Sequence, residues 1–145
     1  MRKGEILSLK FSCLNLDTEK PYIDVLKTKS GKARQIALTK TLYSELCEMK
    51  EMSDAKKADY VFINPITKKP YYDLKKPFNR LCGRADIEDL TFHDLRHTAA
   101  TKMVSAGIDL VVVQEILGHN DIKTTMRYSH PVPERKFAAI NVLDS

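Results

Sequence analysis

Apolar positions in the first half of the chain recur at two different spacings, which predict short helices and short strands. Helices are expected over residues 2–10 and 40–52, and strands over residues 22–27, 34–38 and 60–64. The longer helix rests on Leu42, Leu46 and Met49, which follow one another at helical spacing. Between the first two strands, the segment TKSGKA contains the Ser-Gly pair typical of a turn, so these strands are expected to form a hairpin.

The segment DLKKPFNRLCGRADI, residues 73–87, predicts a helix with two distinct faces. Leu74, Phe78 and Leu81 form a stripe that is expected to point into the core. A separate basic row consists of Lys76, Arg80 and Arg84. Like charges in such a row repel one another weakly in the free protein. The row is therefore either an ordinary solvated face or a surface that contacts the phosphates of DNA.

Capping signals predict that the rest of the chain is helical. Each expected helix has an acidic or hydroxyl side chain at its start and a glycine or proline at its end. These signals are Thr91, Asp94 (a capping box) and Gly107, then Asp109 and Gly118, then Asp121 with Pro131 and Pro133. The tail adds Phe137, Ile140 and Val142, enough for one more apolar contact. The expected fold class is therefore α+β, mostly helical, with a small antiparallel β-sheet at one edge.

The composition is that of one basic globular domain. At 145 residues, 43% of them hydrophobic, the chain can bury a single core. The formal net charge of +5 favours a polyanionic partner, although charge alone is weak evidence. Cys13, Cys47 and Cys82 are odd in number and far apart, which argues for a reducing, cytoplasmic setting without disulfides. No apolar run is long enough to span a bilayer, and the N-terminal segment is too polar for a signal peptide.

The stretch TFHDLRHTAAT, residues 91–101, concentrates the candidate chemistry. On a helical wheel, one polar arc consists of Asp94, Thr98, Thr101, Lys102 and Ser105. His93, Arg96 and His97 project away from this arc, toward the interior. A buried arginine is unfavourable unless it meets an anion, and a helix N-terminus favours a phosphate. Arg96 therefore either pairs with a carboxylate of the protein or belongs to a site that receives an anion from outside.

Two histidines four residues apart also raise the possibility of a zinc site. His93 and His97 share one helix face, as zinc-binding histidines do, and His119 is a candidate third ligand. However, the acid between them is Asp94 rather than a longer glutamate, and Arg96 would place a permanent cation close to the metal. No metal and no other cofactor is therefore expected, and a zinc hydrolase is the weaker alternative.

The segment LGHNDIKTTMRYSH, residues 117–130, completes a pattern that resembles a known family. H-x-x-R-H-T, a later L-G-H and a tyrosine nine residues beyond that histidine resemble the signature of tyrosine recombinases, the phage integrase family. MRKGEILSL is similar to the family's T-G-x-R-x-x-E-x-x-x-L segment from its arginine onward. LKTKSGKARQIAL resembles the family's β-hairpin, in which Lys29 matches the lysine that reaches the active site. The resemblance covers nearly the whole chain.

The resemblance implies metal-independent strand cleavage and rejoining on double-stranded DNA. Arg2 and Arg96 would hold the non-bridging oxygens of the scissile phosphate, since guanidinium groups are always charged and bind two oxygens in fixed geometry. Tyr128 would be the nucleophile and would form a 3′-phosphotyrosine. Lys29 would be the general acid that protonates the leaving 5′ oxygen.

The histidines would have supporting roles in the same scheme. His93 would act as a base or as a phosphate contact, and His119 would hydrogen-bond a phosphate oxygen. His97 would be a packing residue or would support another site residue, and His130 receives no role.

In this family an N-terminal DNA-clamping domain and one or two further helices precede the segment that Arg2 matches. Residues 1–145 are therefore expected to be a catalytic domain that alone binds DNA weakly. The chain is expected to be a monomer in solution, and the full-length protein a tetramer on paired recombination sites. Besides the zinc hydrolase, two alternatives stay open: a non-catalytic DNA-binding remnant and a type IB topoisomerase.

Overall fold

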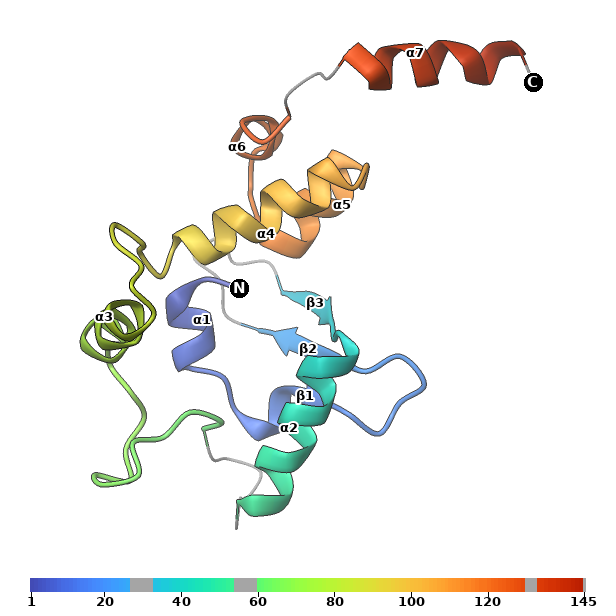
Figure 1. Ribbon diagram of the computed structural model, residues 1–145. Helices are drawn as coiled ribbons and strands as arrows, with labels where there is room; N and C mark the ends of the chain where they lie inside the picture. Colours follow the sequence, from blue (N-terminus) through green and yellow to red (C-terminus); the bar gives the residue numbers. More distant parts are fainter. Residues whose placement is uncertain (27–32, 54–59, 130–132, 145) are drawn as a thin grey trace.

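The computed structural model describes residues 1–26, 33–53, 60–129 and 133–144. Within these ranges the helices are α1 (Lys3–Leu7), α2 (Lys40–Met52), α3 (Lys75–Arg84), α4 (Asp94–Ser105), α5 (Leu110–Leu117), α6 (Ile122–Met126) and α7 (Pro133–Asn141), with the 3-10 turns η1 (Phe11–Cys13) and η2 (Val142–Asp144). The strands β1 (Leu14–Asn15), β2 (Tyr22–Val25) and β3 (Arg34–Ala37) form one antiparallel sheet in the order β1-β2-β3. The expected α+β fold with a small antiparallel sheet is confirmed (Figure 1).

The first hydrophobic core lies between the sheet and α2. Ile23 and Val25 alternate along β2 with less buried neighbours, so one face of the strand is covered. Leu46 supplies the buried position of α2, which spans the predicted residues 40–52. The buried members of this core are Leu9, Leu14, Leu16, Ile23, Val25, Leu46 and Val61.

The second hydrophobic core joins α4 and α5. Its buried members are Ala100, Val104, Val113 and Leu117, and Tyr128 packs against them. The ends of α5 follow the predicted capping signals, whereas the residue that precedes α4 is His93, which makes no side-chain capping hydrogen bond. The carboxylate of Asp109 accepts a hydrogen bond from the backbone N–H of Val111 at 2.7 Å, and α5 ends at Gly118 in the left-handed conformation, with φ of 68°.

The predicted strand at residues 60–64 is wrong. Tyr60 forms an isolated bridge with Lys10, and Ile63 forms another with Pro70. Proline has no backbone N–H, so the second pairing cannot extend into a ladder. Val61 is nevertheless buried in the first core, which explains why the apolar pattern looked like a strand.

Three helix predictions need correction. The first helix ends at Leu7 instead of continuing to residue 10, and α6 ends at Met126, well before the prolines that were expected to stop it. Pro133 instead begins α7, a position that suits its fixed φ and missing N–H. On α3, Leu81 is 61% exposed and Cys82 is buried in its place.

Helix α7 extends away from the rest of the chain (Figure 1). Phe137 and Ile140 are exposed on it, so these two do not make the expected apolar contact. None of the helices in the described ranges is long and apolar enough to cross a membrane.

Candidate active site

The C-terminal end of α5 gathers three arginines through three consecutive backbone carbonyl groups. The pairs are Arg34 Nε to the Ile116 oxygen at 3.2 Å, Arg96 Nη2 to the Leu117 oxygen at 2.5 Å, and Arg2 Nη2 to the Gly118 oxygen at 2.8 Å. The last carbonyl groups of an α-helix lack partners within the helix, and they carry the negative end of the helix dipole. The end of α5 therefore holds three arginines from three other segments. Its carbonyl groups carry only partial negative charges, so they do not neutralise the three positive charges.

Arg96 is the most buried of these cations. Its side chain points inward from the first turn of α4, as predicted, and the residue is 7% exposed. Its Nη1 atom is buried and has no hydrogen-bond partner in the described part of the chain. Burial lowers the pKa of Arg96, and the neighbouring Arg2 lowers it further. No carboxylate among the described residues is hydrogen-bonded to Arg96, and the charge of Glu5 acts on it only through space, where it raises the pKa.

Glu5 is the carboxylate that faces the other two arginines. Arg34 Nη2 donates to Glu5 Oε2 at 2.8 Å and Nη1 donates to Oε1 at 3.1 Å, while the Arg2 backbone N–H donates to Oε2 at 2.7 Å. Burial raises the pKa of Glu5, but the hydrogen bonds from Arg34 and Arg2 outweigh it and bring the pKa below its ordinary value. Three guanidinium groups and one carboxylate leave this cluster with two uncompensated positive charges, which suits an anion such as phosphate.

His119 lies on the turn after α5, near enough to Arg96 and Arg2 for their charges to act on it. Its Nδ1 lies 2.9 Å from the hydroxyl of Thr125, a fully buried residue of α6. Burial, followed by the charges of Arg96 and Arg2, lowers the pKa of His119 to about 4. The imidazole is therefore neutral near pH 7, and its second ring nitrogen is left for another partner.

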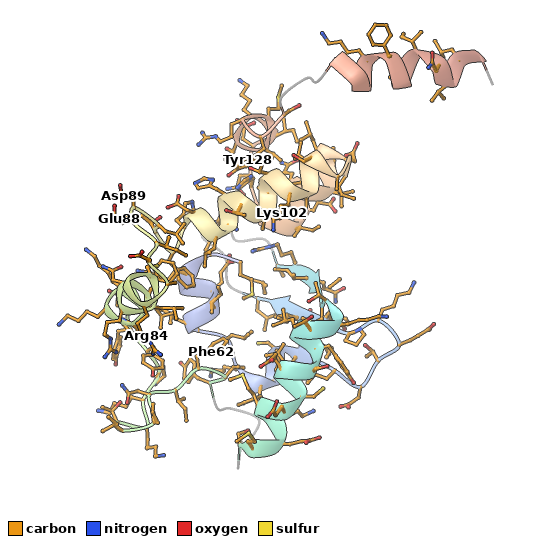
Figure 2. The ribbon with its side chains drawn as sticks, viewed as in Figure 1. Phe62, Arg84, Glu88, Asp89, Lys102 and Tyr128 are labelled. Carbon is orange, nitrogen blue, oxygen red and sulfur yellow. The ribbon has the colours of Figure 1, made fainter. Side chains whose placement is uncertain are left out.

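Tyr128 follows α6 and lies against α4 (Figure 2). Its hydroxyl is 2.5 Å from Nδ1 of His97, and the two ring centroids are 5.7 Å apart. The prediction gave His97 only a packing or supporting role. The contact with the oxygen of the candidate nucleophile is compatible with a supporting role.

His93 differs from its prediction, because it is exposed rather than turned inward. Its ring meets the ring of His97 edge to face, with centroids 4.6 Å apart. Partial burial, His97 and Arg96 all lower the pKa of His93. His93 and Arg96 both line a cavity of about 760 Å³, which Phe78 and Cys82 of α3 also line. The cavity thus lies directly beside the arginine cluster.

The structure brings five of the six predicted catalytic residues into one neighbourhood. They are Arg2, His93, Arg96, His119 and Tyr128, which are linked by the contacts above and by their mutual electrostatic effects. Lys29 lies outside the described residues, and so does His130, so the position of the predicted general acid stays a prediction. Arg34 and Glu5 were not singled out as site residues. Arg34 could have been recognised as a candidate, because it is a charged residue at the start of a half-buried strand.

The predicted DNA-contacting row lies on the solvent face of α3. Its members Lys76, Arg80 and Arg84 are all exposed (Arg84 is labelled in Figure 2). Within the described chain, none of the three is held by a hydrogen bond or an ion pair. Their role in DNA binding stays a prediction.

No group of three His, Cys, Asp or Glu side chains that could hold a metal ion occurs among residues 1–26, 33–53, 60–129 and 133–144. The zinc alternative required His93, His97 and His119 together. However, Nδ1 of His97 is bonded to Tyr128 and Nδ1 of His119 to Thr125. Within the described residues, the group of three ligands that the zinc alternative requires is not found.

The chain is similar to several known proteins. The model of the phage integrase family matches residues 1–135. The integrase of Salmonella phage P22 is 28% identical over 157 aligned residues, which cover 100% of this chain and 40% of that protein. A tyrosine recombinase of Pseudothermotoga lettingae is 30% identical over 145 residues, covering 99% of this chain and 49% of that protein.

Among solved structures, XerH site-specific recombinase bound to its difH substrate in a pre-cleavage complex matches 100% of this chain and 43% of its own, with 28% identity and a TM-score of 0.74. The chain thus spans about half the length, or less, of the relatives that it matches.

Proposed function

Because the chain belongs to the phage integrase family, we propose that it is the catalytic domain of a tyrosine site-specific recombinase. In this proposal it cuts one strand of double-stranded DNA at a time and rejoins it through a 3′-phosphotyrosine, as part of DNA integration or recombination. The complex of the related XerH site-specific recombinase with its difH substrate supports DNA as the partner.

The observation that carries the proposal is the uncompensated positive charge around Arg96. A DNA phosphodiester offers one negative charge and two non-bridging oxygens. The partnerless Nη1 of Arg96 and the guanidinium of Arg2 are the donors for these oxygens. Charge on the phosphoryl oxygens grows in the transition state, so donors that are already fixed in place stabilise the transition state more than the ground state.

Tyr128 supplies the nucleophile in this scheme. Its hydroxyl is hydrogen-bonded to His97 of α4, the helix that also carries Arg96. One helix therefore positions both the nucleophile and an arginine that binds the phosphate. Attack at phosphorus releases the 5′ oxygen of the next nucleotide. Lys29 is proposed to protonate that oxygen, and the covalent link conserves the bond energy for rejoining, so the scheme requires no metal.

Two histidines complete the phosphate site. With the hydroxyl of Thr125 at its Nδ1, neutral His119 offers its Nε2–H to a phosphate oxygen. His93 lines the cavity beside Arg96 and is proposed as a phosphate contact.

The surface of α3 is proposed to contact the DNA backbone next to the scissile phosphate. Lys76, Arg80 and Arg84 face solvent on the helix whose other side lines the cavity. Contacts of this kind make binding fall steeply with salt concentration. The free chain is proposed to be a monomer and the full-length protein to form tetramers on paired sites.

Covalent capture on DNA tests this function. A pool of labelled duplexes with random sequence and a single nick is incubated with the protein in EDTA, then denatured in SDS and separated on a gel. The nick lets the 5′-hydroxyl fragment diffuse away, so that even infrequent cleavage accumulates as a protein–DNA adduct. The proposal expects an adduct that forms without metal and is absent in Tyr128→Phe.

The matched control is Tyr72→Phe, because Tyr72 is 89% exposed and distant from the chemistry in this scheme. It should give the wild-type adduct. Binding without any adduct would identify a DNA-binding remnant. Relaxation of supercoiled plasmids without sequence preference would point to a type IB topoisomerase.

A further inference from the structure

We propose that His97 is a further catalytic residue: the general base that accepts the phenolic proton of Tyr128 as its oxygen attacks the DNA phosphate. This inference rests on the proposed function, and it assigns the base to His97 rather than to His93.

The geometry distinguishes His97 from the other histidines. Of the three histidines that the structure describes, His97 is the one whose ring nitrogen is hydrogen-bonded to Tyr128, with 2.5 Å between Nδ1 and the hydroxyl oxygen. Nδ1 of His119 is engaged by Thr125, and His93 is exposed and meets the ring of His97. A general base must lie within hydrogen-bond reach of the proton that it removes, and His97 satisfies this condition.

His97 is also held rigidly. It lies one residue after Arg96, whose side chain is fixed to the Leu117 carbonyl, and three residues before the fully buried Ala100. The backbone of His97 is therefore fixed at the start of α4, and its half-buried imidazole is held by the Tyr128 hydroxyl and the His93 ring. A base on a fixed helix keeps its distance to the nucleophile throughout the reaction, which is what efficient proton transfer requires.

The surroundings of His97 tolerate the positive charge that it gains. Asp94 lies one helical turn earlier, and its pKa is lowered by hydrogen bonds from Thr91 and, to a smaller extent, by the neighbouring His97 and His93. Asp94 therefore faces an imidazolium at His97 with an ionised carboxylate. His93 and Arg96 oppose that charge, and the DNA phosphate in the arginine cluster offsets both.

The protons and bonds balance as follows. The O–H bond of Tyr128 breaks and its proton moves to Nδ1 of His97, which requires that the proton of neutral His97 reside on Nε2. The Tyr128 oxygen bonds to phosphorus while the bond from phosphorus to the 5′ oxygen breaks. The leaving oxygen takes a proton from the general acid proposed above. Rejoining reverses every transfer, and His97 returns its proton to Tyr128.

The test compares two conservative variants, His97→Gln and His93→Gln. Glutamine can still accept a hydrogen bond from Tyr128, but it cannot take up the proton. A small arylsulfonyl fluoride, which reacts with deprotonated phenols, labels the DNA-free chain near neutral pH, and peptide mass spectrometry follows each of the six tyrosines. Tyr72 is the internal reference, since it is 89% exposed.

The expected result is that labelling of Tyr128 falls at least about tenfold in His97→Gln and changes less than about twofold in His93→Gln. Adduct formation on nicked DNA should fall by about 10²-fold or more in His97→Gln, the usual contribution of a general base. Equal labelling of Tyr128 in wild type and His97→Gln would overturn the proposal. So would a loss of labelling in His93→Gln alone.

A second measurement does not depend on either variant. NMR of the ¹⁵N-histidine-labelled chain reads which ring nitrogen of His97 carries the proton, and Tyr128→Phe assigns the affected signal. A proton on Nε2, with a Nδ1 signal that shifts in Tyr128→Phe, supports the proposal, whereas a proton on Nδ1 overturns it. If labelling and NMR support the His97–Tyr128 pair while wild type forms no DNA adduct, the proposed function fails and the pairing stands.

Discussion

Arg34 and Glu5 face each other with two parallel hydrogen bonds, of 2.8 Å and 3.1 Å. Both side chains are nearly buried, at 10% and 6% exposure. Arg34 opens β3 and Glu5 lies on α1, while Nε of the same guanidinium reaches the carbonyl of Ile116 at the end of α5. One arginine therefore ties the sheet, the N-terminal helix and the paired helices α4 and α5 together.

Replacing Arg34 by lysine should destabilise the fold strongly. Lysine has no planar fork, so it cannot bind both carboxylate oxygens and the Ile116 carbonyl at once. The loss of these charged hydrogen bonds, with the positive charge retained, should lower the free energy of unfolding by about 2 kcal/mol, as measured by urea denaturation. Arg84→Lys, on the exposed face of α3, should stay within about 0.5 kcal/mol of wild type. Similar losses in both variants would show that the Arg34 contacts contribute little.

The pH dependence of stability should contain a contribution from Glu5. The pKa of Glu5 is below its ordinary value of 4.5, so the carboxylate stabilises the fold above that pH. This stabilisation is lost as pH falls below 4.5 and through the folded-state pKa. In Glu5→Gln, the free energy of unfolding should be lower near pH 7 and fall less steeply in acid. Urea titrations from neutral pH to the acid limb measure both slopes, and parallel slopes would exclude Glu5 as the source.

Gly118 should resist substitution more than Gly107 does. Both have positive φ, of 68° and 87°, and an alanine at either is strained by about 1 kcal/mol. A Cβ at Gly118 would also lie 2.7 Å from Cζ of Arg34, whereas a Cβ at Gly107 meets nothing within 4 Å. Gly118→Ala should therefore lose clearly more thermal stability than Gly107→Ala. Equal shifts in melting temperature would mean that Arg34 moves aside freely.

His119 should report whether an anion occupies the arginine cluster. Its pKa is lowered from 6.5 to about 4, so the unfolded chain binds the proton more readily, and stability falls as pH decreases from 6.5 to about 4. A bound anion offsets the repulsion from Arg96 and Arg2, and the pKa of His119 should then rise. Histidine NMR titrations in sulfate and in chloride at equal ionic strength measure this rise. Identical titrations would show that sulfate does not reach the site.

Arg96→Met should separate stability from activity. The buried cation lies beside Arg2 and leaves one nitrogen without a partner, so an apolar side chain of similar length relieves an unfavourable arrangement. The free energy of unfolding should be retained or rise by about 1 kcal/mol, while the covalent DNA adduct disappears. Lys102→Met, an exposed position on the same helix with no role in this scheme, is the control and should change neither quantity. A large loss of stability in Arg96→Met would mean that the Leu117 carbonyl contact outweighs the burial.

Local signals predicted the starts of α5 and α6 and the end of α5. Asp109 and Asp121 each accept a hydrogen bond from the backbone N–H two residues later, and Gly118 adopts the left-handed conformation expected at a helix end. Such interactions involve residues close together in sequence, so the sequence is sufficient to predict them. The prediction of a strand at residues 60–64 was wrong for the opposite reason, because a strand forms only where a segment distant in sequence pairs with it.

The same distinction between local patterns and long-range contacts separates the site residues that were predicted from those that were missed. The pattern around Arg96 made it a candidate because an inward arginine needs an anion, and its burial is confirmed. The pairing of Arg34 with Glu5 joins residues 29 positions apart, and Arg2 meets Gly118 across 116 positions. No local pattern records such contacts, and the link from His97 to Tyr128 likewise depends on how α6 returns to α4.

Since the arginines are anchored on carbonyl groups at the end of α5, their positions depend on the register of that helix rather than on the identity of its side chains. Conservative substitutions of Ile116 or Leu117 leave the main-chain oxygens in place. One residue inserted within α5 turns every later carbonyl by about 100° and advances it by about 1.5 Å. The anchors would then face away from the guanidinium groups that they now hold. The site should therefore tolerate conservative side-chain substitutions in α5 better than any change in the length of this helix.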